Sequence, residues 1–159
     1  MAVVDLFGGN QAKVDAAHGR LVELCRQEGL PYAVNETTYN TRYAQELMEW
    51  ARGRPEAETL RRSLFEAVFV RGVNIAEPQV LLSLVDAAGL PQDEAKEVLS
   101  ARLYSDTVDQ QWTRARQVGV SAVPTFASGD YRIVGAYPTE ALVRLVETAG
   151  AQKRTTAPV

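Results

Sequence analysis

Cysteine and histidine, the residues best suited to nucleophilic or metal chemistry, each occur once in this chain, as Cys25 and His18. One cysteine cannot form an intramolecular disulfide, a dithiol redox pair or a cysteine-based zinc cluster. One histidine leaves no histidine-based metal site and little scope for a nucleophile–histidine–acid triad. These counts exclude much enzyme chemistry, and we predict no metal or other cofactor.

Cys25 falls on a predicted helix that spans about residues 11–28. Leu21 and Leu24 neighbour it at helical spacing, so we expect Cys25 to face the core as a small hydrophobe. The alternative is a reactive thiol, but no neighbour in the sequence would clearly lower its pKa. His18 lies beside the same apolar stripe, where a packed side chain is expected rather than a catalyst.

The elements that would position these residues are mostly helices. Apolar residues at three- and four-residue spacing, opened by prolines or polar caps and closed mostly by glycines, predict six of them. We expect Trp50 and Trp112 in the core, and Arg42 on the surface rather than binding an anion at a helix N-terminus. Counting the residues that open and close them, the helices fall within 11–29, 40–53, 55–72, 78–89, 91–103 and 105–119.

The pattern changes after Gly119. Residues 120–126 are apolar with β-branched side chains, residues 128–130 read Ser-Gly-Asp, and residues 131–134 alternate like a half-buried strand. This combination predicts a β-hairpin. A last helix is predicted between positions 138 and 150.

A two-stranded hairpin is marginal by itself, and its open edges invite another strand. Something is therefore expected to complete the sheet. Three candidates remain open: the apolar start at residues 2–7, a second copy of the chain, and a segment of a longer parent protein.

Composition favours one globular domain. The chain has 159 residues, 46% hydrophobic and 23% charged, which is typical of a folded protein. Its formal net charge is −3 with basic and acidic residues interleaved, so no nucleic-acid partner is expected. No apolar stretch approaches a membrane span and the start lacks the features of a signal peptide, so we expect no membrane partner and a cytoplasmic location.

Two motifs in the last third of the chain carry a family resemblance. Residues 119–126 read Gly-Val-Ser-Ala-Val-Pro-Thr-Phe, and residues 129–138 read Gly-Asp-Tyr-Arg-Ile-Val-Gly-Ala-Tyr-Pro. They resemble the C-terminal half of a thioredoxin-like domain of the DsbA superfamily. Upstream segments such as Asn40-Thr41-Arg42 are similar to the helical insertion of its FrnE-type branch, whose relatives include hydroxychromene carboxylate isomerases and kappa-class glutathione transferases.

The resemblance extends over about residues 7–150 and implies an α/β, mostly α, thioredoxin-like DsbA fold. It implies one truncated domain at 1–150, with a large helical insertion at 11–118 and a C-terminal thioredoxin half, hairpin plus helix, at 119–150. Residues 151–159 are expected to form a flexible tail.

Members of this family begin with a β-α-β segment that carries a Cys-x-x-Cys or serine-bearing turn, and we expect that segment to be missing here. The family activity is thiol–disulfide exchange, which needs an attacking and a resolving cysteine. We therefore expect a redox-inactive form, and leave open whether the chain is an enzyme. The chain also has Gln45 where the family commonly has a histidine.

The resemblance implies a substrate-binding role for Val123, Pro124 and Thr125. It implies a cis Val123–Pro124 bond, next to which the backbone can bind an extended peptide or glutathione. The alternative is that Pro124 only sets an edge-strand turn.

Expected partners are accordingly a peptide or a thiol-containing small molecule, and a homo-oligomer formed through the sheet edge. Two further functions remain as alternatives: a non-catalytic, dimeric peptide- or partner-binding module, and a glutathione-dependent isomerase or transferase. The catalytic serine of the latter relatives lies in the missing segment.

Overall fold

The computed structural model describes residues 1–152, and the chain divides into two compact units between Asp109 and Gln110. The division falls within the helix α7 (Ser105–Gln117). Most of the tail predicted at 151–159 lies outside the described residues.

The first unit begins with two helices, α1 (Val3–Leu6) and α2 (Gln11–Gln27). Asn10 caps α2, since its side-chain oxygen accepts a hydrogen bond from the backbone N–H of Lys13 at 3.1 Å. The apolar start, one candidate for completing the sheet, forms α1 instead, and Ala2 pairs with Thr37 in an isolated antiparallel bridge.

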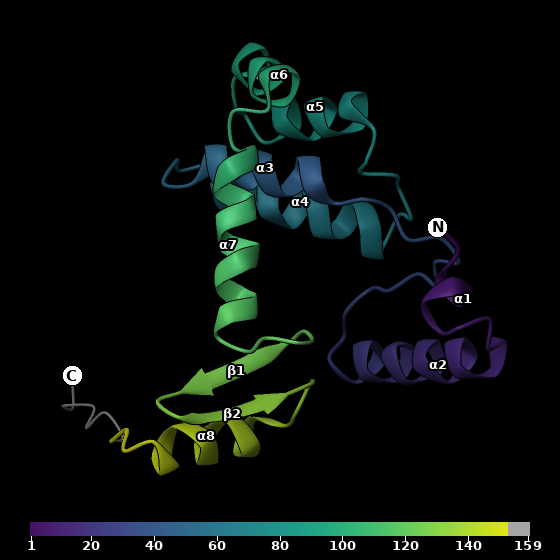
Figure 1. The fold of residues 1–159 in the computed structure, drawn as a ribbon. Helices are drawn as coiled ribbons and strands as arrows, with labels where there is room; N and C mark the ends of the chain where they lie inside the picture. The colour runs from purple at the N-terminus through teal and green to yellow at the C-terminus, as the bar shows by residue number, and fades with distance from the viewer. Residues whose placement is uncertain (153–159) are drawn as a thin grey trace, which may run out of the picture. The chain divides into compact units, whose positions relative to one another are not determined.

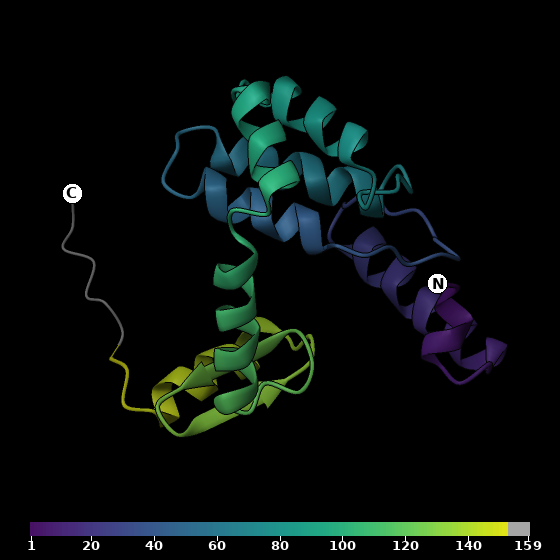
Figure 2. The same cartoon turned by 45° about the horizontal axis from the view of Figure 1, so that its top comes forward.

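Four further helices build the core of the first unit: α3 (Arg42–Ala51), α4 (Ala57–Phe69), α5 (Pro78–Ala87) and α6 (Gln92–Ala101). Helix α3 packs against α4 and α6, and α5 packs against the same two helices (Figures 1 and 2). Their apolar stripes meet in one cluster, as the 3.6-residue period predicts. Its fully buried members include Leu47, Leu60, Leu81 and Val85.

Burial of the large apolar side chains follows the sequence only in part. Trp50 is 7% exposed and belongs to the core, as predicted. The same prediction is wrong for Trp112, which is 43% exposed. Phe65 and Phe69, on the apolar stripe of α4, are also about half exposed.

The second unit contains the end of α7, the strands β1 (Thr125–Ser128) and β2 (Tyr131–Val134), and α8 (Thr139–Thr148). The strands form the predicted antiparallel hairpin, and α8 packs on both (Figure 1). Gly129 has φ +55° at the first position of the two-residue turn, where type II′ turns require a positive φ.

No helix among residues 1–152 combines the length and the apolar composition that crossing a membrane requires.

Candidate functional site

The open edge of β1 is the first candidate site. The backbone N–H of Gly135 donates to the carbonyl of Pro124 at 2.8 Å, which fixes the register at the start of the hairpin. Hydrogen-bonded and non-bonded pairs alternate along an antiparallel ladder. Since Pro124 and Gly135 are hydrogen-bonded, Thr125 and Ala127 occupy the non-bonded positions. Their backbone N–H and C=O groups therefore point outward, away from β2.

Val123 lies directly before this edge, and its peptide bond to Pro124 is cis, as the resemblance implies. The residue is 85% exposed. Within residues 1–152 its backbone N–H and C=O make no hydrogen bond. The hydroxyl of Thr125 donates to the carbonyl of Ala122 at 2.6 Å and so holds the turn around Val123. The residues predicted from the sequence, Val123, Pro124 and Thr125, are thus adjacent. Within residues 1–152, the backbone groups of Val123 and the outward groups of Thr125 form no hydrogen bond.

Arg132, on the neighbouring strand β2, holds the segment that leads from α7 toward Val123. Its Nη1 donates to the carbonyls of Val118 at 2.9 Å and Gly119 at 3.4 Å. Gly119 has φ +77°, and a Cβ there would lie 2.5 Å from the same nitrogen. Glycine is therefore the residue that permits this close approach.

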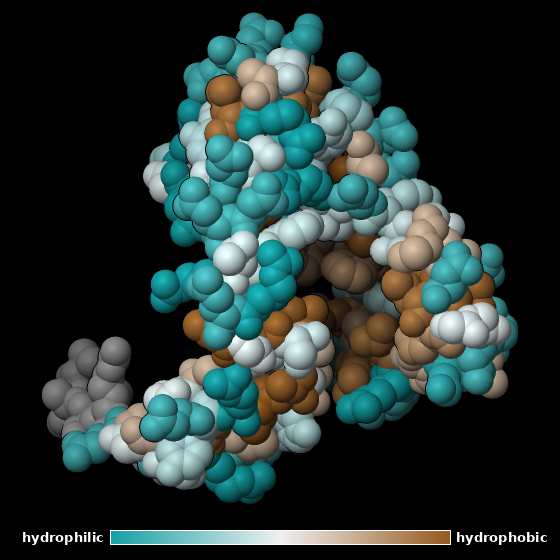
Figure 3. All heavy atoms as spheres, in the orientation of Figure 1, coloured by the Kyte–Doolittle hydropathy of each residue, from teal (hydrophilic) through white to brown (hydrophobic). Residues whose placement is uncertain are grey.

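Cys25 is half-buried and lies outside the hydrophobic cluster, contrary to the expectation of a core position. It lines a groove of about 470 Å³ together with Leu21, Leu30 and Phe65. Apolar colour gathers over α2 and the neighbouring end of α4 in Figure 3. Burial raises the pKa of Tyr32, on the same groove, and Cys25 adds to this rise.

His18 is half-buried and lines two small cavities beside α1. Threonines, Asn35 and apolar residues line the first of these cavities, and Asp15 and Glu36 are among the residues that line the second. Within the described part of the chain no group of three or more histidine, cysteine or acidic residues could hold a metal ion.

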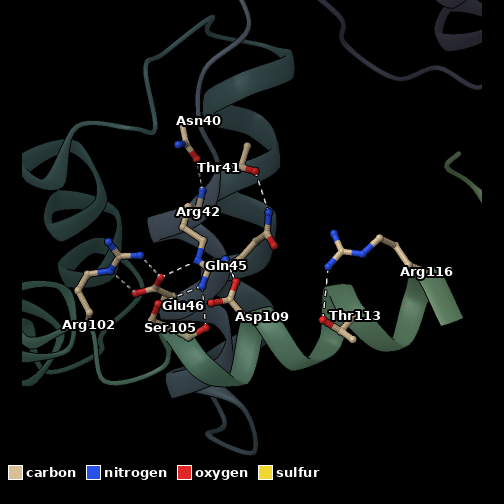
Figure 4. A network of polar contacts seen from close by, with 10 residues as sticks. All are labelled: Asn40, Thr41, Arg42, Gln45, Glu46, Arg102, Ser105, Asp109, Thr113 and Arg116. Atoms are coloured by element: carbon tan, nitrogen blue, oxygen red, sulfur yellow. Dashed lines mark hydrogen bonds and ion pairs between the residues drawn. The ribbon is translucent and has the colours of Figure 1, made fainter. Parts of the chain in front are cut away.

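A buried ionic network in the first unit went unrecognised in the sequence. Glu46, on α3, is fully buried and accepts a hydrogen bond from Arg42 Nε at 2.8 Å. Arg102, directly after α6, donates to both carboxylate oxygens of Glu46, at 2.9 Å and 2.6 Å (Figure 4). Burial raises the pKa of the Glu46 carboxyl, but hydrogen bonds from both arginines outweigh burial and leave this pKa below its ordinary value.

Arg42 extends this network to the first turns of α7, as Figure 4 shows. Its Nη1 donates to Asp109 at 2.6 Å, and its Nη2 donates to the backbone carbonyl and the hydroxyl of Ser105 at 2.6 Å and 3.0 Å. Its side chain is only 15% exposed. The prediction of a surface arginine is therefore wrong, because four acceptor atoms from Glu46, Ser105 and Asp109 surround the guanidinium.

The side chain of Gln45 reaches toward Thr41 at the start of α3 (Figure 4). Its side-chain amide donates to the hydroxyl of Thr41 at 2.8 Å. The amide therefore supports the first turn of α3 at the position where the family commonly has an imidazole.

Comparison with known proteins identifies the class to which this hairpin and helical unit belong. The sequence matches the DSBA-like thioredoxin domain family over residues 2–147. The chain therefore belongs to the DSBA-like thioredoxin family.

Two individual proteins are similar to it. The chain is 35% identical over 74 residues to the uncharacterized protein YwbO of Bacillus subtilis (strain 168), a match that covers 46% of this chain and 37% of that protein. The crystal structure of a probable DsbA oxidoreductase from Streptomyces coelicolor superposes with a TM-score of 0.81 at 24% identity, over 99% of this chain and 69% of that one. The second likeness shows a shared fold, and the matched segment spans little more than a third of YwbO.

Proposed function

We propose that this chain binds an extended peptide or a thiol-containing small molecule at Val123, Pro124 and Thr125, and that it does not catalyse dithiol–disulfide exchange by itself. The observation that carries the binding proposal is that, among residues 1–152, the backbone groups of Val123 and the outward groups of Thr125 and Ala127 form no hydrogen bond. An extended chain can pair with such groups by adding a strand.

The absence of dithiol exchange follows from the cysteine count. A dithiol cycle needs one thiolate to attack and a second cysteine to resolve the mixed disulfide. The sequence contains Cys25 alone. Cys25 lies on α2, and the binding proposal does not use its thiol.

Binding can be tested with a neutral peptide of alternating valine and threonine, followed through backbone amide NMR shifts. The amides of Thr125 and Ala127 are expected to shift, whereas those of Arg132 and Val134 on the other strand are not. Ala127→Pro should weaken binding at least five-fold, because proline removes an outward N–H without touching the β1–β2 ladder. Shifts confined to other residues would contradict the proposal.

Exchange activity is tested by insulin reduction with dithiothreitol. We expect the rate with the chain to equal the background rate, and the rate with Cys25→Ser to equal both. Turnover above background that Cys25→Ser abolishes would disprove the proposed inactivity, because it would be exchange carried out by the thiol of this chain.

The same edge supports a second candidate function, a dimeric partner-binding module. The strand β1 reads Thr-Phe-Ala-Ser, so no like charges would oppose pairing with a second copy. Light scattering at several concentrations, with and without reductant, should then show a reductant-insensitive dimer that Ala127→Pro dissociates. A monomer at every concentration would remove this candidate and leave the peptide-binding proposal in place.

A further inference from the structure

The opposite edge of the hairpin borders a second groove, of about 330 Å³, between β2 and α8. Tyr131 and Tyr137 line it and are 50% and 52% exposed. Ile133 and Leu145 contribute apolar surface. Half-exposed tyrosines beside apolar surface are well suited to contact a peptide, because their rings offer large contact area at a low cost in conformational entropy.

The charged residues that line this groove are both basic, Arg132 and Arg144. The guanidinium of Arg132 donates to the backbone carbonyls at residues 118 and 119, and alternation along β2 puts its side chain on the face opposite Tyr131 and Ile133. The positive charge at the groove is therefore that of Arg144. Within residues 1–152 Arg144 forms no ion pair. The acidic residues Glu140 and Glu147 also lie on α8, but neither lines the groove. The charge of the groove is therefore complementary to an acidic ligand.

The backbone of β2 adds hydrogen-bonding groups along the same groove. Gly135 is hydrogen-bonded to Pro124, so the residues of β2 whose backbone groups face β1 are the alternate ones, Ile133 and Tyr131. The groups of Arg132 and Val134 therefore face the open edge of β2. An extended peptide that pairs with them would bring its side chains alongside the tyrosines and α8.

From this edge and its charge we infer that β2 and α8 form a docking site for an extended peptide segment with acidic side chains. A second copy of β2 is a poorer occupant, because antiparallel pairing of two such strands would bring their Arg132 side chains close together across the new ladder. The site is independent of the peptide site proposed at Val123, since it uses the other strand's edge.

The test uses the full chain and two fluorescein-labelled peptides, one of alternating valine and glutamate and one of alternating valine and lysine. Fluorescence anisotropy should show at least ten-fold tighter binding of the acidic peptide, and weaker binding at higher salt. In amide NMR spectra the acidic peptide should shift Arg132 and Val134 and leave Thr125 and Ala127 in place.

Two variants and one control locate the site. Arg144→Glu should weaken binding of the acidic peptide at least five-fold, while Arg20→Glu, an exposed change on α2, should have no effect. Val134→Pro should weaken it similarly, because it removes an outward N–H. Should Val134→Pro unfold the hairpin, the amide shifts of the unmodified chain decide the question.

Three results would overturn the inference. They are equal binding of the acidic and basic peptides, amide shifts at β1 in place of β2, and unchanged affinity in Arg144→Glu. Self-association of the chain that Val134→Pro abolishes would also overturn it, in favour of a second copy as the occupant.

Discussion

Arg102 binds both carboxylate oxygens of Glu46, although 56 positions separate the two residues in the sequence. Arg102 has φ +54°, a left-handed conformation that non-glycine residues rarely adopt. This backbone conformation lets the guanidinium turn back from the end of α6 toward α3, where it also lies 4.8 Å from the ring centre of Tyr43. The ion pair between Arg102 and Glu46 therefore connects the end of α6 to α3.

Removing the Glu46 carboxylate should therefore destabilise the chain strongly. Glu46→Ala leaves Arg42 and Arg102 without their shared buried acceptor, and we expect a loss of about 3 kcal/mol in the free energy of unfolding. Glu58→Ala is the matched control, because Glu58 binds Arg61 and Arg62 on the exposed face of α4 and should matter little. Urea denaturation measures both, and similar losses for the two variants would contradict the prediction.

The left-handed backbone of Arg102 predicts an inverted order of two substitutions. Arg102→Ala and Arg102→Gly lose the same bonds to Glu46, but alanine keeps the steric penalty at φ +54° and glycine does not. Arg102→Gly should therefore be more stable than Arg102→Ala by about 1 kcal/mol. At a regular helix position the alanine variant would be the more stable of the two. If thermal unfolding shows that order here, the positive φ at residue 102 does not affect stability.

The depressed pKa of Glu46 predicts how stability depends on pH. Its carboxyl titrates below the ordinary value of 4.5 in the folded chain, so between the two pKa values the unfolded chain binds more protons. The stabilisation is complete above about pH 5 and is lost as the pH falls through the folded pKa. The difference in unfolding free energy between the unmodified chain and Glu46→Gln should accordingly shrink below pH 4.5. A difference that stays constant down to pH 3 would contradict this.

Local sequence rules predict the helices and the hairpin well. Proline opens α5 as its first residue, and glycines with positive φ follow α4 and α5 at Gly72 and Gly89, so these boundaries depend on residues within one turn of them. The hairpin follows from Gly129 for the same reason. The resemblance to DsbA-type domains implies the cis Val123–Pro124 bond, because its motif is contiguous. The apolar run at 120–126 predicts the first strand too early, since β1 begins only at Thr125, after the proline.

The network around Arg42 could not be found by such rules. Glu46 is four positions away, but Ser105 and Asp109 are 63 and 67 positions away, and no periodicity connects them. An Arg at i and a Glu at i+4 on a predicted helix usually indicate an exposed pair. The signal that was present is that Glu46 lies four positions before the buried Trp50, which places the two residues on the same side of α3.

Gly72 carries a prediction from a close contact in the loop after α4. It has φ +64°, and a Cβ there would lie 2.6 Å from Oδ1 of Asn35. Asn35 itself is held by its side-chain amide, which donates to the carbonyl of Val68 at 2.8 Å. Gly72→Ala should therefore cost about 1 to 2 kcal/mol of unfolding free energy. Gly53→Ala is the control for φ alone, because Gly53 has φ +82° but no atom within 4 Å of the added Cβ. An equal loss of unfolding free energy in both variants would show that the contact with Asn35 does not contribute.

The spacing of apolar residues predicts which side of a helix is apolar, but it does not predict which of those residues are buried. Two residues of α4 show the difference. Leu60 is fully buried among the core helices, whereas Phe65 is 55% exposed on the groove that Cys25 lines. Leu60→Ala should lower the unfolding free energy by about 3 kcal/mol, through lost burial and the cavity left behind. Phe65→Ala removes a larger side chain and should nevertheless cost less than half as much. Urea denaturation compares the two, and an equal or larger loss for Phe65→Ala would show that its ring is covered in solution, as it would be if a second molecule bound this groove.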